Sequence, residues 1–327
     1  MVRDKSRRRF LQLAAAGATS AGVSRIATTR GRALPAVGGP SVIGQTGRIV
    51  AGQSDPDRWA RVSFDIPFAL TPVVIMNPVT ANETAPVDVH IRKVTRNGFE
   101  FRLEEWDYQD GEHAAEELHF LAMARGVHEL VGALLNAEAG FVAANTTAQS
   151  VSFTQSFSQR PTVFAQAQTH NGRRGDAAGK GDSITTRVDV AGTNQFTVKL
   201  QEQERYRQFH RSETVGYIAL EPGEGILDPP LGKLDSILGG FEVDATTQTV
   251  THDEYPLEFA NDYDSPICLA DMQTLAGHNT ATTRVSDIDG TGATVAVEEE
   301  QSADTEVEHV PEAIGYAVFE DDALLYV

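Results

Sequence analysis

The chain has 327 residues, of which 41% are hydrophobic and 22% are charged, and this composition is typical of a folded globular protein. Its 27 basic and 46 acidic residues give a formal charge of −19, which disfavours nucleic acids and anionic membrane surfaces as partners. The single cysteine, Cys268, excludes an intramolecular disulfide framework and a cysteine-based zinc site. We expect no transmembrane helix, because no run of about 20 apolar residues occurs.

The positive charge is concentrated at the start of the chain. The first 36 residues hold eight basic side chains and one acidic side chain, so that the remainder carries a formal charge of −26. Lysine occurs only five times, and arginine supplies most of the positive charge. A strongly acidic chain with few lysines stays hydrated in concentrated salt, where screening removes its self-repulsion. We therefore expect a halophilic source.

The first segment in chain order carries an export pattern. The run SRRRFL from Ser6 to Leu11 precedes an Ala/Gly-rich stretch between Leu13 and Val23. Twin arginines before a short, weakly apolar region resemble a twin-arginine (Tat) export signal. The resemblance implies that residues 1–40 are a signal peptide and linker, and that the protein is secreted or held at the cell surface.

Four features follow the signal in a fixed order. They are a glycine-flanked segment (Gly47 to Gly52), a Pro72-led apolar run, an alternating stretch from Phe99 to Glu105, and a strand that follows His113. The same order returns twice, with the equivalent histidines 97 and 99 residues apart. Internal repetition at this period predicts three similar units, over residues 45–127, 128–225 and 226–327.

Each unit has the pattern of β-structure. Apolar and polar residues alternate with a period of two, Val, Phe, Thr and Ile are frequent, and Gly, Asn and Asp bound the segments. No convincing amphipathic helix occurs outside the signal. The sequence predicts an all-β protein of three tandem antiparallel, six-stranded β-sandwich units.

The most faithfully repeated chemistry is a Glu…His-x-x-Glu pattern. Its copies are Glu105, His113 and Glu116; Glu202, His210 and Glu213; and Glu299, His309 and Glu312. Strand alternation places both carboxylates at the mouth of a hairpin with the histidine between them, where burial requires compensation of their charge. Three interpretations stay open: a structural hydrogen-bond network, a divalent-metal site, and a hydrolytic carboxylate pair. No cofactor other than a divalent cation is implied.

The first unit resembles the H-type lectins, the family of the snail agglutinins and the discoidin C-terminal domain. The matching pieces are the run WARV from Trp59, the run from Phe68 to Ile75, Asn97-Gly98-Phe99, and Trp106. The resemblance implies a sandwich that forms trimers and binds sugar between neighbouring subunits. Three units in one chain would then form an internal pseudo-trimer, and the protein would be monomeric.

The family's sugar contacts are carried over position by position. The arginine position falls on His90, Arg187 and Arg284, the stacking tryptophan on Trp106, the following histidine on Asp107, and an N-terminal acidic contact on Asp55. No single unit keeps the arginine, tryptophan and histidine together, so a mixed site would need Arg187 or Arg284 to face Trp106. Trp106 itself has two interpretations, an exposed stacking platform or burial against the next unit.

These features predict an exported, non-enzymatic protein that binds glycans or glycoproteins at the cell surface. The alternative is a structural or adhesive surface module that binds protein partners. A catalytic role is disfavoured because the polar cluster occurs in three complete copies.

Overall fold

The computed structural model describes residues 42–130, 135–172, 183–206, 209–227, 239–320 and 323–326. All helix or strand elements among these residues are β-strands, which confirms the prediction of an all-β protein. The predicted Tat signal, residues 1–40, lies outside the described residues. Within the described part of the chain, no helix has the length and hydropathy needed to cross a membrane.

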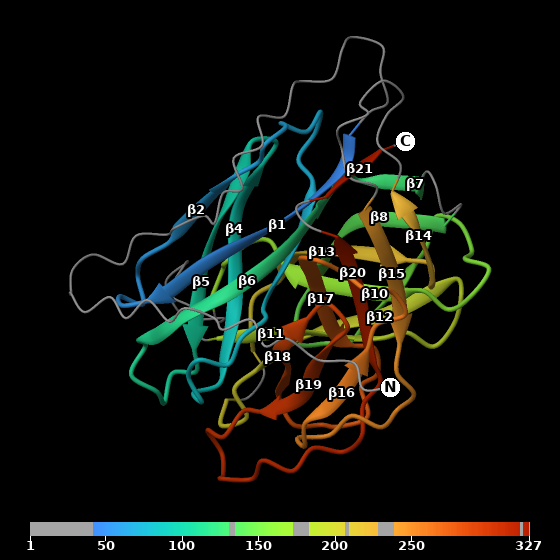
Figure 1. The fold of residues 1–327 in the computed structure, drawn as a ribbon. Helices are drawn as coiled ribbons and strands as arrows, with labels where there is room; N and C mark the ends of the chain where they lie inside the picture. The colour runs from blue at the N-terminus through green and yellow to red at the C-terminus, as the bar shows by residue number, and fades with distance from the viewer. Residues whose placement is uncertain are drawn as a thin grey trace, which may run out of the picture.

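Each unit is a sandwich of one four-stranded and one three-stranded antiparallel sheet (Figure 1). In unit 1 the strands of the larger sheet are, in order, β21 (Leu324–Tyr326), β1 (Val42–Gln53), β6 (His113–Met123) and β3 (Val73–Pro78). Those of the smaller sheet are β2 (Ala60–Ser63), β5 (Gly98–Glu105) and β4 (Val87–Thr95).

Units 2 and 3 repeat this order. In unit 2 the larger sheet holds β10 (Thr162–Ala167), β13 (Glu213–Leu220), β8 (Leu135–Ala144) and β7 (Gly126–Leu130), and the smaller holds β11 (Ile184–Asp189), β12 (Gln195–Glu202) and β9 (Gln149–Ser152). In unit 3 the larger sheet holds β14 (Gly223–Leu227), β15 (Gly239–Ala245), β20 (Ile314–Glu320) and β17 (Pro266–Met272). The smaller sheet holds β16 (Tyr255–Glu258), β19 (Gly292–Glu299) and β18 (Ala281–Asp289).

The fourth strand of each larger sheet follows the last strand of the preceding unit. Strand β7 follows β6 and pairs with β8, and β14 follows β13 and pairs with β15. The cycle closes because β21, which follows β20, pairs with β1 at the beginning of the described chain. The predicted unit boundaries at 127/128 and 225/226 therefore fall inside β7 and β14.

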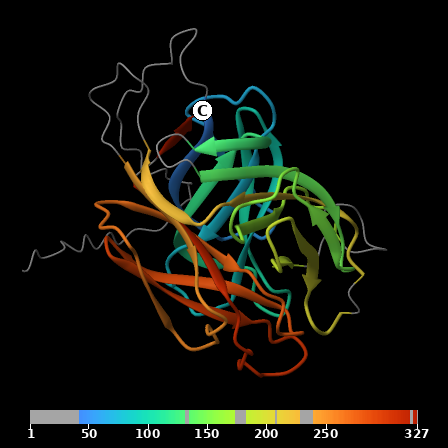
Figure 2. The ribbon, with the colours of Figure 1, turned by 90° about the vertical axis from the view of Figure 1, so that its right-hand side faces the viewer.

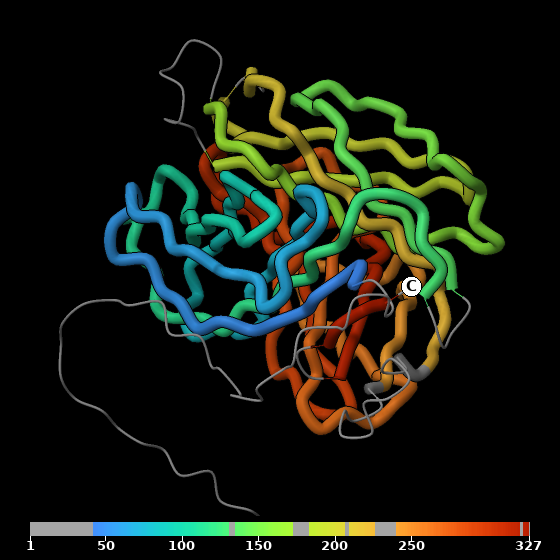
Figure 3. The backbone as a smooth tube through the Cα atoms, turned by 90° about the horizontal axis from the view of Figure 1, so that it is seen from above, coloured from blue at the N-terminus to red at the C-terminus, as the bar shows by residue number. Residues whose placement is uncertain are grey.

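The units surround a common centre, and each forms its own lobe (Figures 2 and 3). One face of each larger sheet packs against the smaller sheet, so that Val74, Val163 and Cys268 lie in three separate sandwich cores. The other face packs into a central core shared by all units, which includes Ile75, Phe164 and Leu269. Burial of both faces explains why these strands read as continuous apolar runs.

Side chains also stand in for β-partners between units. The amide of Gln168 in unit 2 accepts from the Val74 N–H at 3.0 Å and donates to the Val74 carbonyl at 2.7 Å. Gln273 of unit 3 makes the same pair of bonds to Val163 of unit 2, at 2.7 and 2.9 Å. Between units 3 and 1, Nδ1 of His119 accepts from the Cys268 N–H. These bonds satisfy strand edges that the interfaces bury.

Candidate functional site

The repeated cluster forms as the pattern predicts, with each histidine between two carboxylates. In unit 1, Nδ1 of His113 lies 3.1 Å from Glu105 and Nε2 lies 3.2 Å from Glu116. The corresponding distances are 3.3 and 2.9 Å for His210, and 2.5 and 3.2 Å for His309. Each first glutamate ends a strand of the smaller sheet, whereas each second glutamate lies on or beside the inner strand of the larger sheet.

Protein donors surround the second glutamate of each cluster. The hydroxyl of Thr80 and the backbone N–H of Asn82 donate to Glu116, and Thr169 and the Asn171 N–H do the same for Glu213. In unit 3, Thr274 and the N–H groups of Ala276 and Gly277 donate to Glu312. Each donor segment lies just after the buried apolar strand of the larger sheet. The histidine contacts the second glutamate on this sheet and the first glutamate on the smaller sheet, so the cluster joins the two sheets of a sandwich.

These contacts shift the titration of the cluster. Burial opposes ionisation, but hydrogen bonds from His309, the charge of Arg187 and the hydroxyl of Thr274 outweigh it and lower the pKa of Glu312 to about 2. Burial likewise opposes the charged form of His210, but hydrogen bonds to Glu202 and Glu213 raise its pKa to about 8. The protonated form of His210 is thus favoured between its two carboxylates.

An arginine from the neighbouring unit completes two of the three clusters. Arg187 of unit 2 donates to Glu312 of unit 3 at 2.7 Å, and both side chains are fully buried. Arg284 of unit 3 donates to Glu116 of unit 1 at 3.1 Å. At the third interface His90 of unit 1 occupies the arginine position, and it contacts Glu104 and His170 instead.

Most of the residues predicted to contact sugar are buried and not exposed to a ligand. His90, Arg187 and Arg284 lie at the interfaces between units, and their side chains are buried within the contacts just described. Trp106 is 2% exposed, so the interpretation as an exposed stacking platform is wrong. It begins the hairpin loop between β5 and β6, which contacts the corresponding loops of units 2 and 3 through Asp107 and Tyr108. Asp55 and Asp107 are exposed.

The sequence did not single out a polar group at the interface of units 1 and 2. It comprises His90, Glu104, Arg102 and His170, with the ring of Trp59 beside Arg102 and 5.6 Å from that of His170. Glu104 precedes the repeated Glu105, and His170 follows the repeated Thr169. Because histidine stands there only in unit 2, repetition could not reveal it, although the departure of His90 from arginine was a signal.

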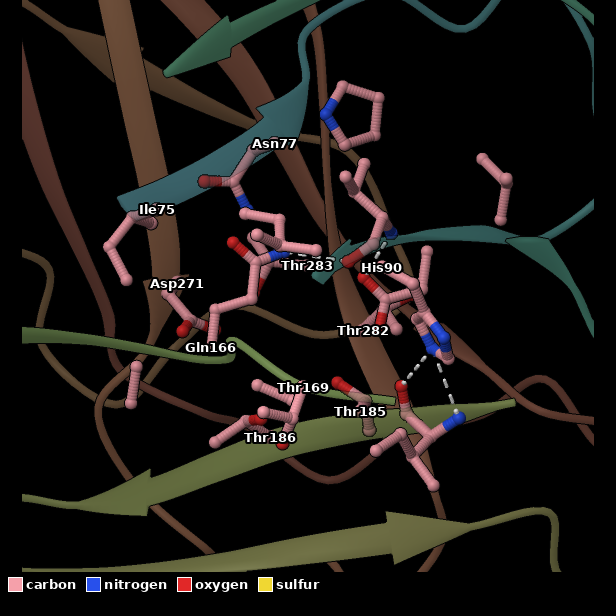
Figure 4. Close-up of a pocket in the computed structure, with 18 residues that line it drawn as sticks. Ile75, Asn77, His90, Gln166, Thr169, Thr185, Thr186, Asp271, Thr282 and Thr283 are labelled. Carbon is pink, nitrogen blue, oxygen red and sulfur yellow. Dashed lines mark hydrogen bonds between the residues drawn. The ribbon is translucent and has the colours of Figure 1, made fainter. Parts of the chain in front are cut away.

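A polar cavity of about 40 Å³ lies between the units (Figure 4). Equivalent positions of all three units line it: Asn77, Gln166 and Asp271 form one set, and Asp88, Thr185 and Thr282 form the other. The volume suffices for a few water molecules. Burial raises the pKa of Asp88 to about 6 and that of Asp271 to about 8.

The chain shows limited similarity to known proteins. No family model matches the chain, and no solved structure matches it. Among curated proteins, halomucin of Haloquadratum walsbyi (strain DSM 16790 / HBSQ001) is 30% identical over 259 residues, which cover 75% of this chain. The chain spans only 3% of the length of halomucin. The similarity therefore covers most of this chain but only a small part of that relative.

Proposed function

We propose that the protein is an exported, non-enzymatic surface module that adheres to protein partners through one end of its three-unit body. The similarity to part of halomucin is compatible with an exported surface protein. The observation that carries the proposal is a surface where three hairpin loops meet, called here the loop surface and formed by residues 106–112, 203–206 with 209, and 300–310.

The loops of the loop surface contact one another in pairs. The Tyr206 hydroxyl donates to Asp107 at 2.8 Å, linking units 2 and 1, and the Gln301 N–H donates to the Tyr108 hydroxyl at 3.2 Å, linking units 3 and 1. The Arg205 N–H donates to Ser302 at 3.1 Å and links units 2 and 3. These hydrogen bonds join the three loops into one surface.

The loop surface carries exposed apolar side chains beside carboxylates. Of the six large apolar side chains that are exposed among the described residues, four lie on it: Tyr108, Phe209, Val307 and Val310. Apolar groups that are clustered on an otherwise acidic surface are characteristic of interaction sites. The buried His–Glu clusters favour a structural role over catalysis, because protein donors already occupy their carboxylates.

The test measures binding of the full chain to cell-envelope protein in molar salt. The double variant Phe209→Ser, Val310→Ser is expected to lose most binding, because it removes the exposed apolar contacts without touching the core. Leu70→Ser is the matched control, since Leu70 is 66% exposed but lies in the loop between β2 and β3. Equal binding by both variants would count against the proposal.

Carbohydrate binding is the second candidate, because the H-type lectin resemblance implies sugar binding at the interfaces between units, and we infer that it would occur beside the interface of units 1 and 2. There Asp55 is exposed, and its neighbour Pro56 accepts a hydrogen bond from Arg102, whose guanidinium lies 4.7 Å from the Trp59 ring centre. A glycan array probed in molar salt tests this candidate. A signal that Asp55→Ala abolishes would replace adhesion to protein with sugar recognition, whereas no signal for any glycan would remove the candidate.

A further inference from the structure

Two imidazoles and a carboxylate converge between units 1 and 2. Nδ1 of His90 lies 3.3 Å from Nδ1 of His170 and 2.8 Å from a carboxylate oxygen of Glu104. Their potential ligand atoms all lie within 4.8 Å of one another. Strands β4 and β5 of unit 1 supply His90 and Glu104, and the segment after β10 of unit 2 supplies His170.

The surroundings orient His90 toward the other two groups. Its Nε2 lies 3.1 Å from the carbonyl oxygen of Ile184. A carbonyl and a carboxylate can only accept, so Nε2 carries a hydrogen toward Ile184 and Nδ1 carries one toward Glu104, and a metal ion on Nδ1 would displace the latter. Histidines that bind metals in proteins commonly donate their second ring N–H to a carbonyl in this way. Glu104 is oriented as well, by the Ser183 hydroxyl at 3.2 Å and by Arg102.

We propose that His90, Glu104 and His170 form a binding site for one Zn²⁺ ion, with water as the fourth ligand. Nitrogen ligands at about 2.0–2.1 Å in a tetrahedral zinc site stand about 3.3 Å apart, which is the separation of the two Nδ1 atoms. Two imidazoles and one carboxylate form a donor set that suits Zn²⁺ better than Ca²⁺ or Mg²⁺, which prefer oxygen ligands.

At this interface His90 stands where Arg187 and Arg284 form arginine–glutamate bridges at the other two interfaces. A metal there would link unit 1 to unit 2 through ligands from both. Arg102 opposes this in part, because its positive charge contacts the same carboxylate and its Nη2 lies 3.4 Å from Nε2 of His170. With Nδ1 of His170 on the metal, Nε2 becomes a donor, so this last contact to Arg102 is lost.

The test uses the full, tag-free chain dialysed against micromolar Zn²⁺ and then analysed for metal content. We expect one Zn²⁺ per chain, and at least about a tenfold weaker affinity in His170→Ala. Co²⁺ provides a second measurement on the intact protein. It should give the visible absorption of a tetrahedral site and quench the fluorescence of Trp59, whose ring lies 5.6 Å from that of His170.

His252→Ala is the matched control, since this partly exposed histidine lies in unit 3, outside the proposed site. Circular dichroism and parallel measurements on His170→Gln separate loss of ligand from loss of fold. The proposal is overturned if the chain binds neither metal, if His170→Ala and His170→Gln both retain the stoichiometry, or if His252→Ala loses as much metal. If the His170 variants retain binding, the cluster of Glu83, Glu105 and His113 becomes the candidate metal site.

Discussion

At the residue scale, buried charges hold the units together. Arg187 and Glu312 are withdrawn from water on both sides of an interface, at 2.7 Å. Such a pair adds little net stability compared with an apolar pair, but removal of one partner leaves the other charge buried and uncompensated. Arg187 and Arg284, which the lectin resemblance assigned to sugar, therefore join neighbouring sandwiches through buried ion pairs.

Arg187→Met tests this role. We expect the free energy of unfolding to fall by about 3–5 kcal/mol, because Glu312 loses its buried cationic partner. The control is Arg92→Met, whose ion pair with Glu100 is partly exposed and should contribute less than about 1 kcal/mol. Denaturant unfolding in molar salt measures both, and equal losses would contradict the assignment.

Asp271 lies in the polar cavity and should make stability depend on pH. Burial raises the pKa of Asp271 from its usual 3.8 to about 8 in the fold. Between these values the folded state binds more protons than the unfolded state, so stability falls as the pH rises. Asp271→Asn should therefore raise the free energy of unfolding by about 2 kcal/mol or more at pH 9, with little effect near pH 4.

Thermal unfolding across pH 4–9 provides that measurement. His210 contributes in the same direction, since its raised pKa gives stability that is complete below pH 6.5 and is lost as the pH rises through about 8. The variant should therefore flatten the alkaline decline without abolishing it. A melting temperature that is lower than that of the parent at pH 9 would show that the ionised Asp271 is stabilised.

At the element scale, strand exchange links each sandwich to the next. Each larger sheet draws one strand from the preceding unit, which covers an edge that would otherwise invite association with other chains. Strand alternation predicted the strands of the units themselves. It could not predict the exchange, because β7, β14 and β21 are short and their pairing partner depends on how the units pack.

Leu325 on β21 tests the closing contact. Its side chain is fully buried in the central core, and Leu325→Ala should lower the free energy of unfolding by about 2–5 kcal/mol. Leu70→Ala is the control, because a surface substitution should change stability by no more than about 0.5 kcal/mol. Denaturant unfolding measures the free energy of unfolding of both variants. If Leu325→Ala lowers it as little as Leu70→Ala does, the contact of β21 with the central core does not stabilise the fold.

At the scale of the whole molecule, the three sandwiches form a ring with a shared centre (Figure 3). At each junction two strands are hydrogen-bonded to each other: β21 to β1, β7 to β8, and β14 to β15. At the last two junctions the chain also runs from one unit into the next, whereas β21 and β1 are joined by hydrogen bonds alone. The three junctions therefore share the same strand pairing. The arrangement agrees with the predicted internal pseudo-trimer.

A circular permutant follows from this equivalence. It starts at Leu135, joins Tyr326 to Val42 through a short Gly/Ser linker, and ends at Leu130. Since Val42 pairs with Tyr326, the linker has little distance to span, and β7 becomes the closing strand. We expect a melting temperature within a few degrees of the parent and the same small-angle scattering profile. A permutant opened between Ile75 and Met76 should not fold, because that cut divides a fully buried strand.

The sequence by itself determined what local periodicity and repetition encode. The alternation of side chains specified β-strands, the threefold recurrence specified three units, and the Glu…His-x-x-Glu spacing placed His113 between Glu105 and Glu116. Each of these depends on residues within one unit, where strand geometry limits which side chains can meet.

Only the tertiary structure decided what happens between units. It joined Arg284 to Glu116 across 168 positions, buried Trp106, brought His170 to His90, and placed β21 on β1. No local pattern specifies these contacts, because they depend on the rotation and spacing of whole sandwiches around the shared core. That packing is governed by the summed burial of many side chains and not by any one motif.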